Sequence, residues 1–242
     1  MSDERRRKGR RQLAALLFEP GKRPGPEALA ALAAKGGYTV TLQEAGWAEL
    51  LRDGLTFDLE GMAPGPARDH LNVRHRYGLP TDFDVSGLEA VSLTPGPHLA
   101  GAEHLLPVVR VATALLLELA ALPGLAAISW VPAANLLSPE WFGRAAGAWL
   151  EGGPFPAFGL ASLAACSEGG VCSEGLRFLA GREFRVDRAA RQPMPPIAIA
   201  VRLLDWLVAH GTLEAPCEVE LAGVGPVWLD LDPDGTISAR CL

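Results

Sequence analysis

The segment over residues 103–131 constrains the fold more than any other part of this chain. The spacing of its apolar residues predicts a helix over 103–122 with Leu, Val and Ala almost all round, and such a helix is buried. Pro123 and Gly124 end the helix, and the apolar run over 125–131 is typical of an interior strand. A chain with this core must be layered, with helices packed on a sheet.

Strand and helix patterns alternate along the rest of the chain. The strand patterns cover residues 13–18, 38–43, 55–60, 88–93, 155–165, 183–186, 217–221, 227–231 and 236–241, and the helix patterns cover 27–35, 46–53, 138–150, 173–180 and 195–211. The last strands follow one another directly, which favours antiparallel pairing. We therefore predict an α+β fold, with helices packed on a mixed, largely antiparallel β-sheet. Two related sandwich lobes would also fit this pattern.

The domain organisation expected from these patterns is simple. Residues 1–12 form a basic, flexible N-terminus, and residues 13–242 form a single α+β globular domain with sub-lobes at 13–100 and 101–242. The basic N-terminus fits either an arm for nucleic acid or acidic lipid, or a solvated terminus, which we favour. The net charge of -6 argues against a general affinity for nucleic acid, and we predict no nucleic-acid partner.

Targeting signals and cysteines bear on the compartment. The apolar run over 13–18 is too short for a secretory signal, and prolines and glycine interrupt the uncharged stretch over 119–139, so we predict no membrane span. The four cysteines are Cys166, Cys172, Cys217 and Cys241. Cys166 and Cys172 flank a Gly-rich turn and could form a disulfide or part of a metal site, but the absence of an export signal favours thiols. We predict a cytoplasmic protein.

Two carboxylates are candidates for acid–base chemistry. Asp58 and Glu60 share the polar face of one predicted strand, about 7 Å apart. Paired carboxylates at such a distance can serve as acid and base. Alternation also produces such pairs on any solvated strand face, and we favour that second interpretation.

The histidines are the other candidates. His70 and His75, with Asp69, lie in the irregular segment over 61–87, and His98 and His104 flank a predicted helix start. Imidazole and carboxylate together would suit zinc. Because no HxH, HExxH or Cys/His cluster is present, we predict no metal site and no cofactor.

Residues 230–235 resemble the start of a calcium loop. The twelfth position counted from Asp230 is Cys241, which is a poor calcium ligand. Asp232-Pro233-Asp234-Gly235 instead predicts a hairpin turn. The tryptophans fall mostly on apolar faces and are expected in the core, whereas several exposed together would mark a binding surface.

From about Val108 onward the chain resembles a bacterial family known as domain of unknown function 4261. The similar passages are LPGLAAISW over 122–130, SPEWF over 138–142 and EGLRFLAGREFRV over 174–186, although Ser173 stands where threonine is expected. The resemblance covers about half of the chain and implies a fold and a bacterial, cytoplasmic setting. The family has no established activity, so it implies no catalytic residues.

Two classes of function remain. We predict a non-enzymatic protein-binding or accessory protein, because no catalytic motif is present, and its partner is another protein or a second copy joined through strand edges. The alternative is a small hydrolase-type enzyme, in one version metal-dependent, with a site among Asp58, Glu60, His70, His75 and His98. A deep pocket that gathers several of these side chains would favour the enzyme.

Overall fold

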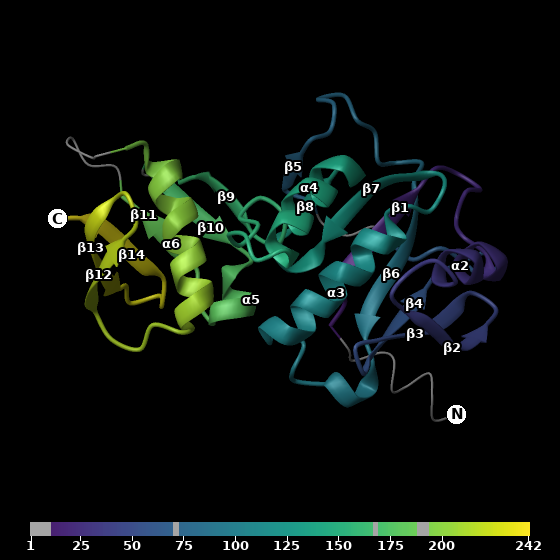
Figure 1. Ribbon diagram of the computed structural model, residues 1–242. Coiled ribbons are helices and arrows are strands. Elements are labelled where there is room, and N and C mark those ends of the chain that lie inside the picture. The colour runs from purple at the N-terminus through teal and green to yellow at the C-terminus, as the bar shows by residue number, and fades with distance from the viewer. Residues whose placement is uncertain (1–10, 70–72, 167–168, 188–193) are drawn as a thin grey trace. The chain divides into compact units, whose positions relative to one another are not determined.

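The computed structural model describes residues 11–69, 73–166, 169–187 and 194–242 (Figure 1). The chain divides into two compact units, Met1–Gly152 and Gly153–Leu242, and each contains its own sheet. The predicted α+β class with mixed, largely antiparallel sheets is confirmed. The division falls after Gly152, whereas the sequence patterns suggested one after residue 100, because two α-helices and two strands beyond residue 100 belong to the first unit.

The first unit is built on a sheet of eight strands in its described residues, in the order β2–β3–β4–β6–β1–β7–β8–β5. The strands are β1 (Ala14–Phe18), β2 (Thr39–Glu44), β3 (Trp47–Arg52), β4 (Leu55–Glu60), β5 (His75–Tyr77), β6 (Glu89–Pro95), β7 (Leu125–Trp130) and β8 (Asn135–Leu137). Strand β1 lies between β6 and β7 and is buried along its whole length. The pairing of β5 with β8 is parallel, and the other strand pairings among the described residues of this sheet are antiparallel.

Helices and a long connection cover the two faces of this sheet. The helices are α2 (Pro26–Ala33), η1 (Pro97–Leu99), α3 (Leu106–Leu119), η2 (Val131–Ala133) and α4 (Pro139–Leu150). Helix α3 contacts β4 and α4, and α4 contacts β7. On the face that holds Ala15 and Leu17, the covering side chains come from the connection between β4 and β6, and they are Val73, Leu79, Phe83, Val85 and Leu88.

The start of α4 follows its sequence signal. Ser138 is the N-cap, its hydroxyl accepts a hydrogen bond from the Trp141 backbone N–H at 3.1 Å, and Pro139 is the first helical residue. The helix expected over 46–53 is wrong, because Trp47–Arg52 forms β3 in the middle of two hairpins. Gly46, with φ 77°, and Gly54, with φ 79°, turn the chain at the two ends of that strand.

The second unit has a sheet of six strands in its described residues, in the order β12–β13–β14–β11–β10–β9. The strands are β9 (Ser162–Ala165), β10 (Val171–Glu174), β11 (Phe184–Val186), β12 (Cys217–Leu221), β13 (Gly225–Leu231) and β14 (Ile237–Cys241). The helices are α5 (Leu176–Ala180) and α6 (Pro196–His210), and α6 contacts β10, β11 and β12. Two expected boundaries are corrected: only the end of the region 155–165 is a strand, and residues 173–174 belong to β10 because the helix starts after Gly175.

Within the described residues, no helix combines the length and the apolar character needed to cross a membrane. The expected helix–strand–loop interpretation of residues 119–139 agrees with the end of α3, strand β7 and η2.

Candidate functional site on the open face of the six-stranded sheet

The six-stranded sheet has one buried face and one open face. In β12, Val219 and Leu221 are buried, whereas Glu218 and Glu220 are exposed. The same alternation runs through β10, β11, β13 and β14, where Val227, Phe184 and their neighbours point into the core beside α6. Strand β9 departs from it, because Ser162 and Leu163 are both buried. The side chains between the core residues therefore form a single surface, which we call the open face.

The strand register arranges the open face in rows. One row joins Glu218, Trp228 and Arg240, and the next joins Asp230, Ser238, Arg185 and Cys172. Directly opposite side chains lie about 5 Å apart at Cβ, so members of a row are neighbours. The strands β12 and β13 contribute acidic residues and Trp228, and β14 and β11 contribute two arginines.

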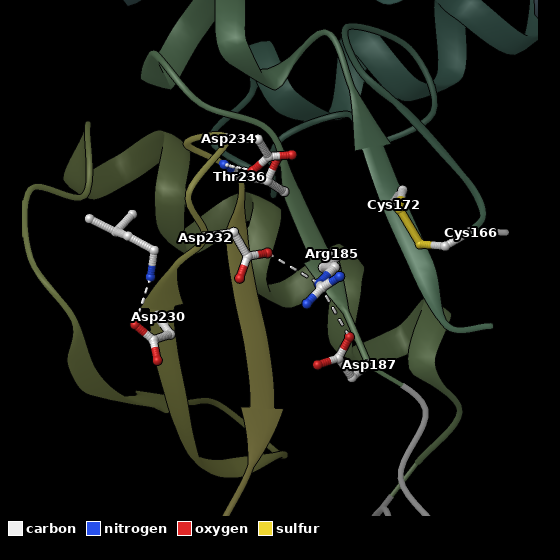
Figure 2. Close-up of polar contacts among 9 residues, drawn as sticks. Cys166, Cys172, Arg185, Asp187, Asp230, Asp232, Asp234 and Thr236 are labelled. Atoms are coloured by element: carbon white, nitrogen blue, oxygen red, sulfur yellow. Dashed lines mark hydrogen bonds and ion pairs between the residues drawn. A yellow bond between two sulfur atoms is a disulfide. The ribbon is translucent and has the colours of Figure 1, made fainter. Parts of the chain in front are cut away.

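Arg185 is held by two carboxylates (Figure 2). Its Nε lies 3.4 Å from Oδ2 of Asp232 and 3.5 Å from Oδ1 of Asp187. Figure 2 shows these three side chains together, with the Cys166–Cys172 disulfide on the neighbouring strand. Because both carboxylates accompany one guanidinium, this part of the open face carries no excess positive charge.

The hairpin between β13 and β14 forms as its residues predict. The Asp232 N–H donates to the Thr236 carbonyl oxygen at 2.9 Å, and Gly235 has φ 82°. The backbone N–H and hydroxyl of Thr236 and the charge of Arg185 lower the pKa of Asp234. Asp230 accepts from the Leu231 backbone N–H at 2.8 Å. The Asp234 carboxylate is therefore anionic at neutral pH and makes turn contacts, as the hairpin prediction requires.

Cys166 and Cys172 form a disulfide with Cα atoms 5.5 Å apart, so the preference for thiols at these two positions is wrong. The bond joins the end of β9 to β10 across their hairpin. Gly169 and Gly170 have φ 86° and 90°, and their turn brings the two cysteines together. Cys217 and Cys241 are thiols and half-buried.

The carboxylates singled out in the sequence do share a face of β4, but that face is not solvated. Asp58 is 2% exposed and Glu60 is 9% exposed, because the connection after β4 packs over this side of the sheet. Ser92 lies opposite Glu60 and Thr94 lies opposite Asp58, and both are buried. Glu60 pairs with Arg68, which belongs to that connection. The expectation of an ordinary solvated strand face is therefore corrected.

The histidines do not gather around these carboxylates in the described residues. His98, in η1, is exposed and lies 3.3 Å through Nδ1 from the Thr56 hydroxyl, at the start of β4. His75 lies in β5, at the sheet edge remote from β4, and burial together with Arg74 lowers its pKa. His70 lies outside the described residues. No group of three or more His, Cys, Asp or Glu that could hold a metal ion occurs in the part of the chain that the structure describes.

The tryptophans fall into two classes. Trp130 and Trp149 are buried, as expected of core residues. Trp47, Trp141, Trp206 and Trp228 are half-buried, and of these Trp228 lies on the open face. Sequence reasoning missed this surface, although the alternation of Glu218 and Glu220 with valine and leucine was a signal for it.

Comparison with known proteins adds no relative: no family model, no curated protein and no solved structure matches this chain. The resemblance to domain of unknown function 4261 remains a prediction.

Proposed function

We propose that this protein is a non-enzymatic protein-binding or accessory protein, and that the open face of its second unit docks a segment rich in Arg or Lys on another protein. The observation that carries the proposal is the charge of that face. Acidic side chains outnumber basic ones there, and the exposed or half-buried carboxylates are Glu174, Asp187, Glu218, Glu220, Asp230 and Asp232.

Charge complementarity then specifies the partner. Arg185 is already accompanied by Asp187 and Asp232, so it does not offset the remaining carboxylates. Glu218 and Glu220 project from β12, which is an edge strand, and can be approached from the side. Carboxylates in such an array attract a cationic segment and repel an acidic one.

Trp228 supplies the apolar part of the surface. It lies between Glu218 and Arg240 in its row and is half-buried. An indole face beside carboxylates suits an incoming guanidinium, which stacks on the ring while its N–H groups bond the acids. We infer that Trp228 anchors the segment and the carboxylates orient it.

The enzyme alternative receives no such support. A hydrolase site among Asp58, Glu60, His75 and His98 would need these groups to converge, and His75 is separated from β4 by the width of the sheet. We retain as part of the proposal the cytoplasmic, bacterial setting that the sequence predicts. A homodimer is an alternative partner arrangement.

The test measures binding of a fluorescent hexa-arginine peptide to the full chain, with hexa-glutamine as the uncharged control. We expect hexa-arginine to bind and its affinity to fall with added salt, because exposed charges are screened. Glu218→Gln combined with Asp230→Asn should weaken binding by about fivefold, because the free energies of two exposed charge contacts are lost together. Trp228→Ala should weaken it by a similar factor through the lost stacking of about 1 kcal/mol.

The matched control is Glu19→Gln combined with Glu151→Gln. Both positions are exposed, both lie in the first unit, and the change in net charge is the same. This control should bind hexa-arginine as the unmodified chain does. Equal weakening in the control, or no binding by the unmodified chain, would overturn the proposal.

A further inference from the structure

We propose that the Cys166–Cys172 disulfide is a redox-sensitive brace for the open face, so that its reduction by a dithiol weakens docking of the basic segment. The inference rests on the docking function proposed above and adds a means of regulating it. It is drawn from the position of the disulfide in the sheet and from the short ladder that pairs its hairpin with the strand of Arg185.

The disulfide belongs to the same surface as the docking residues. Cys172 lies directly opposite Arg185, and the row continues through Ser238 to Asp230. Both cysteines are half-buried, so a small reductant can reach the bond. Figure 2 shows the disulfide beside the Arg185 cluster, on the adjoining strand.

The hairpin of β9 and β10 pairs with the rest of the sheet through a short ladder, and the Ser173 hydroxyl anchors the end of β10 that lies away from the disulfide, where it accepts a hydrogen bond from the Phe184 N–H. Between β10 and β11, the register pairs are Val171 with Val186 and Cys172 with Arg185. Among the described strands, β9 is an edge strand whose neighbour is β10. Close to the disulfide, the hairpin turn has backbone hydrogen bonds from Cys166 N–H to Gly170 O at 3.3 Å and from Gly169 N–H to Cys166 O at 3.1 Å.

A covalent bond in this position limits fraying of the hairpin. Without it, the end of β9 can separate from β10, and β10 can then shift against β11 at the pair that includes Arg185. Arg185 lies between Asp187 and Asp232. If β11 is less ordered, these three charged side chains take up more conformations relative to one another. A binding surface that must be ordered on docking binds more weakly than one already ordered.

The redox step is ordinary thiol–disulfide exchange. One thiolate of the dithiol attacks a sulfur of the protein disulfide, the S–S bond breaks, and the other cysteine leaves as a thiolate that takes up a proton. The second thiol of the reductant then displaces the first cysteine and closes a cyclic disulfide. The protein gains two electrons and two protons, and the dithiol is oxidised. Dithiol reductants are present in the cytoplasm, which is the compartment predicted for this chain.

The test compares hexa-arginine binding by the oxidised chain and by the chain reduced with dithiothreitol, which is removed before the measurement. Alkylation with iodoacetamide counts the thiols: the oxidised chain should take two labels, on Cys217 and Cys241, and the reduced chain four. We expect reduction to weaken binding by about three- to tenfold, because a few side chains and one hairpin must then be ordered when the peptide docks. Cys166→Ser combined with Cys172→Ser should bind like the reduced chain in both conditions.

The control variant is Cys217→Ser combined with Cys241→Ser, which retains the disulfide and should keep the whole redox effect. Hydrogen exchange checks that the change is local. The amides over 162–174 should lose protection on reduction, while those of β12–β14 keep theirs.

The outcomes separate the two proposals. Binding that is equal in both redox states, or tighter after reduction, overturns the brace and leaves docking intact. Absence of binding in both states overturns the docking function itself. Loss of protection throughout the sheet would show that reduction unfolds the unit, which also overturns a local brace.

Discussion

The hydroxyl of Ser173 donates a hydrogen bond to the Glu183 carboxylate over 2.6 Å and accepts one from the Phe184 backbone N–H over 2.8 Å. The same carboxylate accepts from the backbone N–H groups of Gly175, Leu176 and Arg177, at the start of α5. One side chain therefore joins β10, α5 and β11.

Replacing Glu183 should destabilise the second unit. In Glu183→Gln the carboxylate loses its charge and one oxygen acceptor, so we expect the free energy of unfolding to fall by about 1–3 kcal/mol. Ser173→Ala should cost about 1 kcal/mol, because the Phe184 N–H then lacks its acceptor. Urea unfolding measures both, and Glu220→Gln on the exposed edge is the control. If Glu183→Gln costs no more than that control, the joining role assigned to Glu183 is wrong.

Tyr38 predicts a pH dependence of stability. It is 3% exposed, and its burial, with the charge of Glu118, raises its pKa from 10.0 to about 12. The folded state thus favours the neutral phenol. The contribution of Tyr38 to the free energy of unfolding is therefore fully present below pH 10 and is lost as the pH rises from 10 to 12, where the phenol ionises in the unfolded chain before it ionises in the folded one. Two pKa units correspond to at most about 2.7 kcal/mol.

Tyr38→Phe tests this assignment. The variant should lack the part of the alkaline loss that Tyr38 causes, and denaturant unfolding at a series of alkaline pH values measures it. An absorbance titration should show one of the two tyrosines ionising late in the unmodified chain. An unchanged alkaline slope in Tyr38→Phe would refute the assignment.

Ala134 should tolerate glycine with a gain in stability. Its φ of 47° and ψ of 37° lie in the left-handed region, which costs an alanine about 1 kcal/mol. Its carbonyl oxygen accepts from the N–H groups of Arg74 and His75, so the conformation is fixed by its neighbours. We expect Ala134→Gly to raise stability by about 0.5 kcal/mol after the added entropy of the unfolded chain is subtracted.

Ala148→Gly is the matched control, and it should lower stability where Ala134→Gly raises it. Ala148 is exposed in the last turn of α4, where glycine should cost up to about 1 kcal/mol. Thermal unfolding of the two variants side by side checks the pair. A lower melting temperature for Ala134→Gly would mean that its left-handed conformation is not a source of strain.

The sequence predicted those features whose determinants are local. The Ser138-Pro139 helix start and the Asp232–Gly235 turn are set by side-chain capping and by allowed φ values within a few residues. Local reasoning failed at residues 46–53, where apolar spacing fitted a short helix. The Asp53-Gly54 pair, with φ 49° and 79°, is a hairpin signal that would have favoured β3 instead.

The candidate site depended on relations between distant residues. Alternation predicts that Asp58 and Glu60 share a face, but which face is covered depends on the packing of residues 73–88 over it. The Cys166–Cys172 bond likewise depends on the register of β9 and β10. The rows of the open face combine β11 with strands that begin more than thirty residues later, so no short window of sequence contains them.

Arg68 pairs with the largely buried Glu60, and replacing one partner should lower the free energy of unfolding more than replacing the other. The Glu60 side chain is 12% exposed and the Arg68 side chain 49% exposed. Arg68→Ala leaves the Glu60 carboxylate with little water and without its Arg68 partner, and we expect the free energy of unfolding to fall by about 2 kcal/mol.

Glu60→Gln replaces that carboxylate with an amide that costs less to bury, while Arg68 remains hydrated, so we expect a loss below about 1 kcal/mol. Combining Arg68→Ala with Glu60→Gln should recover part of the first loss, since no charge is then left buried. Chemical denaturation of the three variants measures this coupling. Additive losses would show that Arg68 stabilises the chain through packing rather than through the charge of Glu60.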